Sequence, residues 1–307
     1  MGKLSPILEN YLKQSPLLPN LETLSIPDLR KQFNDRQIKF NEKAPSYDLS
    51  IQNSTIMNFS TEIPIRIYRK DSDKLQPVLI FFHGGGFVFG NLDTLECHCR
   101  EIAHFANCMV ISVDYPLAPE NPFPAAPEAL YAATTWIYEH LEQWNGDRKR
   151  LFVGGSSSGS TLAAVVCMMV RDRGGAEIQG QILLCPMTDD NFDTVSYLEN
   201  ASGYNLTREQ CIWFISQYAP EKEQRQNPLA LPLKSANFQD LPSALVVTAE
   251  YDPLRDDGRG YAIKLQEAGV NCMDLFFKGM VHGFPTLPLD LPEKSEVLTQ
   301  ISRFIHS

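Results

Sequence analysis

The sequence predicts an α/β fold with a mostly parallel central sheet flanked by helices. Short runs rich in β-branched and aromatic residues recur along the 307 residues, and longer helical stretches separate them. Several runs, such as VLIFF and ALVVT, are apolar at every position, which is typical of parallel strands buried on both faces. The alternation of strand and helix predicts right-handed β-α-β units and therefore a doubly wound sheet.

The predicted elements follow in chain order. Strands are expected at residues 78–82, 109–113, 150–153, 181–185, 244–248 and 273–277. The helical stretches between them include residues 125–143 and 161–171.

Two regions interrupt the alternation. Residues 1–45 are polar and helix-like with proline breaks, and residues from about 187 to 225 separate the fourth predicted strand from the fifth. Neither region predicts a strand or an independent domain. Segments of this kind are often lids over an active site.

The composition excludes several classes of protein. Hydrophobic residues at 43% and charged residues at 21% describe an ordinary globular chain. A formal net charge of −10 repels phosphate backbones, so we expect no nucleic-acid partner. The N-terminal stretch lacks a signal-peptide core and no run of about 18 apolar residues occurs, which predicts no stable membrane insertion and a cytoplasmic location. Seven cysteines without a C-x-x-C pair fit a reducing compartment.

No metal or cofactor is predicted. The run at residues 189–200 opens like a calcium loop, but Thr194 and Asn200 stand where that loop needs glycine and glutamate. The Cys-His-Cys run at residues 97–99 has no second pair of ligands with which to build a tetrahedral site.

A turn rich in glycine and serine follows the third predicted strand, in LFVGGSSSGST at residues 151–161. Its Gly155-x-Ser157-x-Gly159 frame allows a strand to reverse sharply into a helix and holds the central serine in a strained backbone above the sheet. The helix that follows would aim its first amides at the serine oxygen. A phosphate-binding loop is the competing interpretation, but Ser160 stands where that motif needs its lysine.

A second turn, HGGGFVFG at residues 83–90, follows the first predicted strand and is called the glycine turn below. Its three consecutive glycines leave backbone N–H groups uncovered, so that a developing oxyanion could approach to hydrogen-bond distance. A dinucleotide site is not favoured, because Phe89 stands where that motif needs its third glycine. A plain turn without a catalytic role remains the alternative.

An acyl-transfer site also needs a general base. His282 is the best candidate, because it lies in a glycine-bracketed loop directly after the last predicted strand, where parallel sheets place their chemistry. His83 belongs to the glycine turn. The remaining histidines have no supporting motif: His98, His104, His140 and His306.

The acid that orients the base is predicted at Asp252. It follows the fifth predicted strand, and Pro253 biases it toward an extended backbone that places its carboxylate at the same sheet edge. The order serine, acid, histidine is that of the α/β-hydrolases. Three rivals lie nearby, of which the last two look like the exposed start of a helix: Glu250, Asp256 and Asp257.

Taken together, the sequence resembles the hormone-sensitive-lipase branch of the α/β-hydrolases, a group of esterases that includes relatives of arylacetamide deacetylase. The resemblance extends from about residue 45 to the end of the chain. The motifs that carry it are HGGGFVFG (83–90), DYPLAPENPFPAA (114–126), GSSSGS (155–160), TDDNFDTVSY (188–197), YDPLRDDG (251–258) and GMVHGF (279–284).

The resemblance implies a serine carboxylesterase or lipase-like hydrolase that acts on small, short- to medium-chain acyl esters. Ser157 would be the nucleophile, His282 the base and Asp252 the acid. An amidase or deacetylase with the same three residues, or a non-catalytic small-molecule-binding relative, remains an alternative. Family members often dimerise through a sheet edge, so a homodimer is also an expectation.

The resemblance also implies the surroundings of these residues. A helical cap would be formed by residues 1–45 and by the insertion at about 187–225, over a catalytic domain at 46–307. The oxyanion hole would use the amides of Gly84, Gly85, Gly86 and Ser158. The walls of the substrate pocket would include Phe87, Trp213 and Phe284.

Two departures from the family pattern stand out. Ser156 and Ser158 flank the nucleophile where the family commonly has an aspartate or threonine before it and an alanine after it, and Pro116 replaces an arginine. We interpret the departures as linked, with an acid and a base lost together so that neither is left as a stranded charge.

Overall fold

The computed structural model describes residues 3–14, 21, 23–41, 45–58 and 61–307. Its strands are β1 (Ser50–Asn58), β2 (Thr61–Arg69), β3 (Gln76–Phe82), β4 (Met109–Val113), β5 (Gly146–Ser156), β6 (Ile178–Leu184), β7 (Ser243–Tyr251) and β8 (Cys272–Val281). Its α-helices are α1 (Pro6–Gln14), α2 (Ile26–Asn41), α3 (Glu96–Phe105), α4 (Ala125–His140), α5 (Ser158–Arg173), α6 (Val195–Glu199), α7 (Arg208–Tyr218), α8 (Lys222–Arg225), α9 (Arg255–Glu267) and α10 (Pro292–Ile305).

The eight strands form one twisted sheet in the order β1-β2-β4-β3-β5-β6-β7-β8. The pairs from β4 to β8 are parallel, whereas β1 and β2 pair antiparallel with each other and β2 pairs antiparallel with β4. All six predicted strands are present within or overlapping β3 to β8. The predicted α/β class with a mostly parallel sheet is therefore confirmed.

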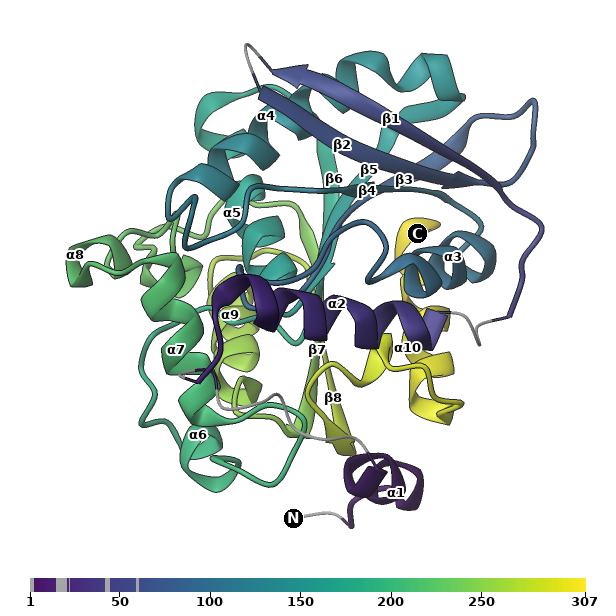
Figure 1. Ribbon diagram of the computed structural model, residues 1–307. Coiled ribbons are helices and arrows are strands. Elements are labelled where there is room, and N and C mark those ends of the chain that lie inside the picture. Colours follow the sequence, from purple (N-terminus) through teal and green to yellow (C-terminus); the bar gives the residue numbers. More distant parts are fainter. Residues whose placement is uncertain (1–2, 15–20, 22, 42–44, 59–60) are drawn as a thin grey trace.

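The central strands are buried on both faces, as their apolar runs predicted. In β3, Val78, Ile80 and Phe82 belong to one hydrophobic cluster with residues of α4, α5 and α9. Leu79 and Phe81 point the other way, into a second cluster with residues of α3 and α10. Successive side chains of a strand alternate between faces, so each strand of this kind needs a helical layer on both sides. Figure 1 shows the helices arranged around the sheet in this way.

Strands β1 and β2 were missing from the sequence-based expectation. β2 alternates polar and apolar residues, and its buried residues Ile63, Ile65 and Ile67 have at most 1% exposure. β1 is mostly polar and lies at the sheet edge. Strands with one solvated face carry a weaker apolar signal than the buried parallel strands, which explains the omission.

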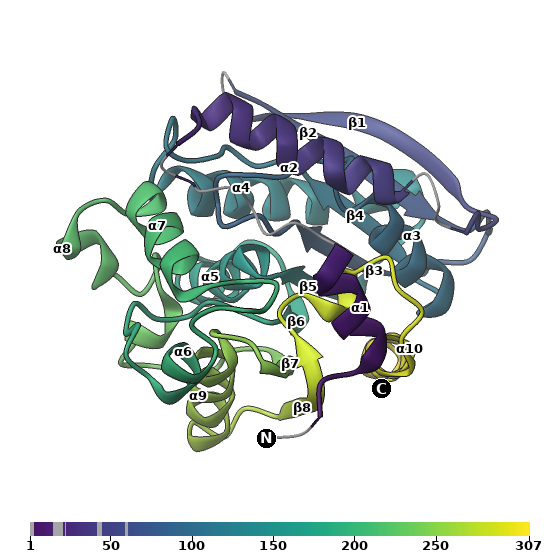
Figure 2. The ribbon, with the colours of Figure 1, turned by 60° about the horizontal axis from the view of Figure 1, so that its bottom comes forward.

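Where the structure describes them, the two interrupting regions contain helices joined by turns and loops. The N-terminal region contributes α1 and α2, and the insertion contributes α6, α7 and α8. Figures 1 and 2 show α2 crossing the molecule on the side where α7 also lies, while α1 lies near β8 and α10. Ser5 donates a backbone hydrogen bond of 3.2 Å to Gly279 in β8, which ties the start of the chain to the sheet edge.

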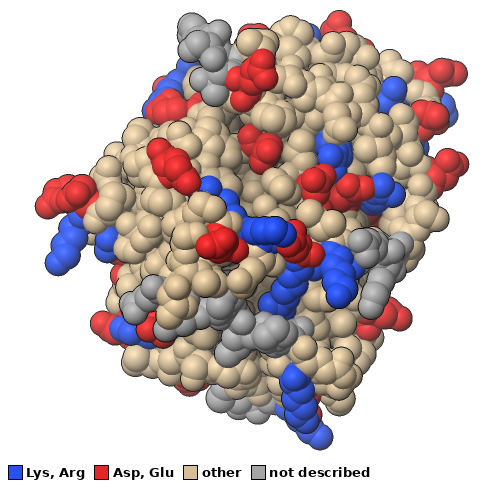
Figure 3. Space-filling view, viewed as in Figure 1, with Lys and Arg blue, Asp and Glu red and all other residues tan. Residues whose placement is uncertain are grey.

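None of the helices in the described part of the chain is long and apolar enough to cross a membrane. Basic and acidic side chains are interspersed over the face seen in Figure 3.

Candidate active site

Ser157 occupies the sharp turn between β5 and α5. Its backbone has φ 55° and ψ −123°, a conformation that L-residues rarely adopt. The turn closes only because glycines flank it: a Cβ atom on Gly155 would lie 2.3 Å from the backbone carbon of Gly159, and one on Gly159 would lie 2.1 Å from the carbonyl oxygen of Phe82. The strained backbone is thus maintained by close packing against the end of β3.

His282 and Asp252 come from loops at the same edge of the sheet. The imidazole Nε2 of His282 lies 3.0 Å from Ser157 Oγ, and its Nδ1 lies 2.8 Å from Asp252 Oδ2. The other carboxylate oxygen of Asp252 accepts a 2.9 Å hydrogen bond from the backbone N–H of Leu254. The structure therefore brings together the three residues that the sequence singled out. Both oxygens of the Asp252 carboxylate accept a hydrogen bond, which fixes its orientation.

The rival acids lie elsewhere. The carboxylate of Glu250 accepts a 2.8 Å hydrogen bond from the backbone N–H of Gly279, and that of Asp256 accepts one of 2.8 Å from the N–H of Ser196. Asp257, expected on an exposed helix start, is instead 2% exposed. Burial raises the pKa of the Asp257 carboxyl well above its usual value.

The predicted oxyanion donors lie around the serine. Among the described residues, no acceptor is paired with the backbone N–H groups of Gly85 and Gly86, or with that of Ser158 at the first position of α5. The first amides of a helix have no partner within it, so the N–H of Ser158 is available to a ligand. Gly84, by contrast, packs closely on the serine turn, where a Cβ atom would lie 2.8 Å from the carbonyl oxygen of Ser156.

A cavity of about 130 Å³ opens beside Ser157 and His282. Its wall includes Gly84, Gly85 and Gly86. The insertion and the N-terminal helices complete it with Asn205, Leu206, Phe214, Tyr11, Leu12, Phe33, Arg36 and Gln37. Both regions that interrupt the strand-helix alternation thus contribute to the same cavity.

The three predicted wall residues do not line this cavity. Phe87 is 1% exposed and stacks on Tyr218 with ring centroids 3.9 Å apart, and Phe284 is fully buried against Phe277. Trp213 packs beside Phe214, and Phe214 lines the cavity in its place. A helix or turn position fixes which way a side chain points, and the motif alone does not.

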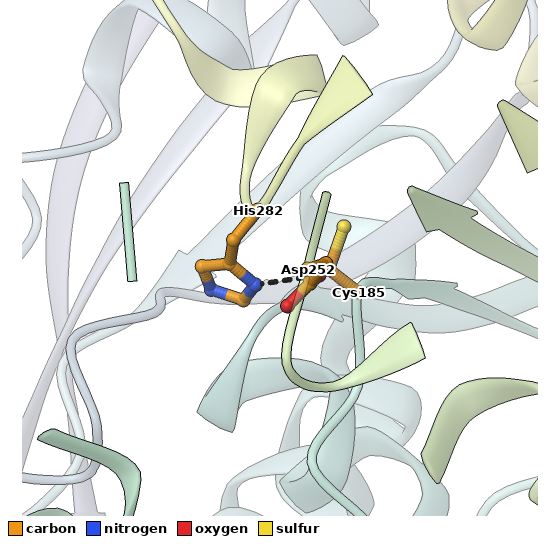
Figure 4. Close-up of side chains that lie close together, drawn as sticks. All are labelled: Cys185, Asp252 and His282. Carbon is orange, nitrogen blue, oxygen red and sulfur yellow. Dashed lines mark hydrogen bonds and ion pairs between the residues drawn. The ribbon is translucent and has the colours of Figure 1, made fainter. Parts of the chain in front are cut away.

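Cys185 lies beside Asp252, on the side away from the imidazole of His282, as Figure 4 shows. The potential ligand atoms of Cys185, Asp252 and His282 all lie within 4.8 Å of one another, which raises the question of a metal site. Burial and the neighbouring Asp252 carboxylate raise the pKa of the Cys185 thiol well above its usual value. Nδ1 of His282 and Oδ2 of Asp252 already bond to each other at 2.8 Å. The geometry favours a hydrogen-bonded acid and imidazole.

Two asparagines of the insertion support the histidine and acid loops, and sequence reasoning missed both. Asn200 is fully buried, and its side-chain amide donates to the carbonyl oxygens of Glu250 and Asp252 at 3.2 and 3.3 Å. Asn205 donates a 3.0 Å hydrogen bond to the carbonyl oxygen of His282. Their signal in the sequence was weak, because asparagine is common in loops and turns.

Replacing Asn200 with alanine is expected to lower the free energy of unfolding by about 1–3 kcal/mol, because two buried hydrogen bonds are lost. Urea-induced unfolding measures the change. Asn191→Ala, at an exposed position in the same insertion, serves as the control, with an expected change within about 0.5 kcal/mol. Equal changes in the two variants would contradict the role of Asn200.

Comparisons with known proteins identify the family of this chain. A model of the α/β-hydrolase fold family matches residues 79–286, which is more than half of the chain. Carboxylic ester hydrolase LipN of Mycobacterium tuberculosis is 36% identical over 293 residues, covering 92% of this chain and 77% of its own. Ethyl acetate hydrolase of Pseudomonas putida is 31% identical over 309 residues, covering 97% of each chain. An esterase structure from Pyrobaculum calidifontis superposes with a TM-score of 0.91 at 35% identity, covering 98% of both chains. The chain therefore belongs to the α/β-hydrolase fold family, in the branch of enzymes that resemble hormone-sensitive lipase.

Proposed function

We propose that this enzyme hydrolyses small carboxylic esters through an acyl-enzyme formed on Ser157. The observation that carries the proposal is the chain of two short contacts, from Ser157 Oγ to His282 Nε2 at 3.0 Å and from His282 Nδ1 to Asp252 at 2.8 Å. A serine hydroxyl is a weak nucleophile by itself, and a base within hydrogen-bond distance activates it. The esterase names of the relatives support the same reaction class.

In the first step, Ser157 Oγ attacks the ester carbonyl while His282 Nε2 takes the hydroxyl proton. Asp252 accepts from Nδ1–H, which keeps Nε2 unprotonated before the attack and stabilises the imidazolium after it. The tetrahedral oxyanion would accept hydrogen bonds from the amides of Gly85, Gly86 and Ser158, each contributing about 3 kcal/mol of transition-state stabilisation.

His282 then donates its proton to the leaving alcohol, and the acyl group stays on Ser157. In the second step, His282 removes a proton from water as the water oxygen attacks the acyl carbon. The bond from that carbon to Ser157 Oγ then breaks, His282 returns the proton to Oγ, and the carboxylic acid leaves. No metal or cofactor takes part in these steps.

Stoichiometric labelling by a fluorophosphonate, together with turnover of matched p-nitrophenyl esters and anilides, tests the proposal. We expect one label per chain, on Ser157, and faster turnover of the ester than of the matched amide. A protein that resists labelling and turns over neither substrate would refute the hydrolase. Faster turnover of the anilide would assign an amidase instead.

The helical cap, which we assign to residues 1–45 and to the insertion at about 187–225, would enclose the acyl chain. Phe214 of α7 closes one side of the cavity: a Cβ atom on Gly86 would lie 2.2 Å from its ring. The cavity lies between Ser157 and the side chains of the cap, so we propose that it holds the acyl group and that the Phe214 ring limits the length of chain it accepts. We therefore infer a preference for short to medium acyl chains.

Phe214→Ala is expected to shift this preference toward longer chains. Removing the ring extends the cavity, so kcat/KM for the octanoate relative to the acetate should rise by about tenfold. A p-nitrophenyl ester series from acetate to decanoate measures the shift. Trp213→Phe is the matched control, because Trp213 is adjacent but does not line the cavity. An unchanged chain-length profile in Phe214→Ala would place the acyl pocket elsewhere.

A further inference from the structure

The glycine turn has an unusual backbone. Three consecutive residues have left-handed φ angles, at 124° for Gly85, 62° for Gly86 and 67° for Phe87. The last of these carries a side chain and is therefore strained. Inside the turn, the N–H groups of Val88 and Phe89 both bond to the carbonyl oxygen of Gly85, at 3.1 and 2.9 Å. Strain of this kind persists only where surrounding contacts fix the backbone.

Arg30 of α2 supplies one set of these contacts. Its Nε donates a 2.7 Å hydrogen bond to the carbonyl oxygen of Val88, and its Nη2 donates one of 2.8 Å to that of Ala118. The N–H of Ala118 in turn donates a 2.9 Å hydrogen bond to the carbonyl oxygen of Phe87. One guanidinium group thus links the outgoing half of the glycine turn to the segment that follows β4.

The guanidinium group of Arg30 also forms an ion pair with a carboxylate. Nη1 and Nη2 pair with the two oxygens of Glu120, at 2.9 and 2.6 Å. A planar group with several donors in fixed directions can bind a carboxylate and two carbonyl oxygens at once, which a single ammonium group cannot do with the same geometry.

The next turn of α2 makes two further contacts with the glycine turn. Asn34 accepts a 3.3 Å hydrogen bond from the N–H of Gly90, and Phe33 stacks on Phe89 with ring centroids 5.3 Å apart. Residues three and four positions apart lie on one side of a helix, so Arg30, Phe33 and Asn34 present a single surface to residues 88–90.

We infer that Arg30 and Asn34 are positioning residues that set the direction of the Gly85 and Gly86 amides. The inference rests on the ester-hydrolase function proposed above. Neither side chain lines the cavity beside Ser157, so both act through the backbone of the glycine turn. Because an oxyanion donor works only at hydrogen-bond distance from the transition state, a small rotation of this backbone should weaken catalysis more than substrate binding.

Arg30→Lys tests the inference, because lysine keeps the positive charge but cannot bind Glu120 and the two carbonyl oxygens with the same geometry. We expect kcat to fall by about tenfold while KM changes less than about threefold. Asn34→Leu removes the acceptor for the N–H of Gly90, and we expect it to lower kcat by about threefold. Lys31→Met is the matched control: Lys31 is on the same helix, its side chain is 73% exposed, and it pairs with Asp35 one turn away.

A trifluoromethyl ketone separates positioning from general stabilisation. Its adduct with Ser157 carries an oxyanion in the hole, so its inhibition constant should rise in proportion to the loss of kcat/KM in Arg30→Lys and Asn34→Leu. Midpoints of thermal unfolding are recorded for all variants. An unchanged inhibition constant and kcat in both variants, whatever the unfolding midpoint, would overturn the positioning role.

The same experiment distinguishes the two proposals. If the wild-type protein hydrolyses esters and Ser157→Ala does not, the ester-hydrolase function stands, whatever Arg30→Lys shows. If the wild-type protein neither turns over esters nor binds the ketone, the ester-hydrolase function fails, and the positioning role fails with it.

Discussion

Ser157→Ala is expected to lower kcat for short p-nitrophenyl esters by about 10⁴- to 10⁶-fold. The variant keeps the cavity and the amides around it, but it has no nucleophile and no hydroxyl within reach of His282. Serine hydrolases that lose one member of the triad retain only the part of catalysis that comes from binding and from the oxyanion donors. Steady-state turnover and fluorophosphonate labelling of the purified variant measure the loss.

The control for this variant is Ser235→Ala. Ser235 lies in a loop between α8 and β7, and its hydroxyl exchanges hydrogen bonds with the backbone of Asn237. It should keep wild-type turnover and labelling. If Ser157→Ala turned over esters at a rate within tenfold of the wild type, the nucleophile would have to be another residue.

Asp252→Asn is expected to lower kcat by about 10⁴-fold with little change in KM. A neutral amide at this position can donate to Nδ1 of His282, which places the imidazole proton on Nε2, where it blocks the transfer from Ser157. Geometry would change little, because the N–H of Leu254 still has an acceptor at Oδ1. The loss should therefore be seen in turnover and not in the stability of the fold.

Two further variants, in which a carboxamide also replaces a carboxylate, are compared with Asp252→Asn. Asp290→Asn changes an exposed carboxylate of a surface loop and should leave kcat unaltered. Glu250→Gln alters a carboxylate two positions from Asp252 whose hydrogen bond runs to Gly279. A loss of 10⁴-fold in Glu250→Gln with a small loss in Asp252→Asn would reassign the acid.

The sequence contained the information for the sheet and for the three residues at its edge. Several of the strands are continuous apolar runs, such as VLIFF in β3 and ALVVT in β7, and runs of this kind are typical of parallel strands buried on both faces. Ser157, Asp252 and His282 each follow one of these strands, and parallel strands end at a common edge. Local sequence was therefore enough to bring residues far apart in the chain to one place.

Contacts that depend on side-chain direction could not be predicted in this way. Trp213 and Phe214 are neighbours on α7, yet only the second lines the cavity, because its direction is fixed by the packing of α7 on Gly86 and Phe89. Asp257 belongs to an acidic run that suggests an exposed helix start, but its carboxylate accepts hydrogen bonds from the N–H groups of Thr188 and Asp189 in the interior.

The sequence by itself determined the class of fold, the strained serine turn and the order of the candidate triad, because each depends on local periodicity or on glycine at fixed spacing. Only the tertiary structure decided the walls of the cavity and the contacts of Arg30 with residues 88 and 118. Those contacts join segments 58 and 88 residues apart. Hydrogen bonds of that kind have no periodic signature, since a side chain finds its partner only after the elements have packed.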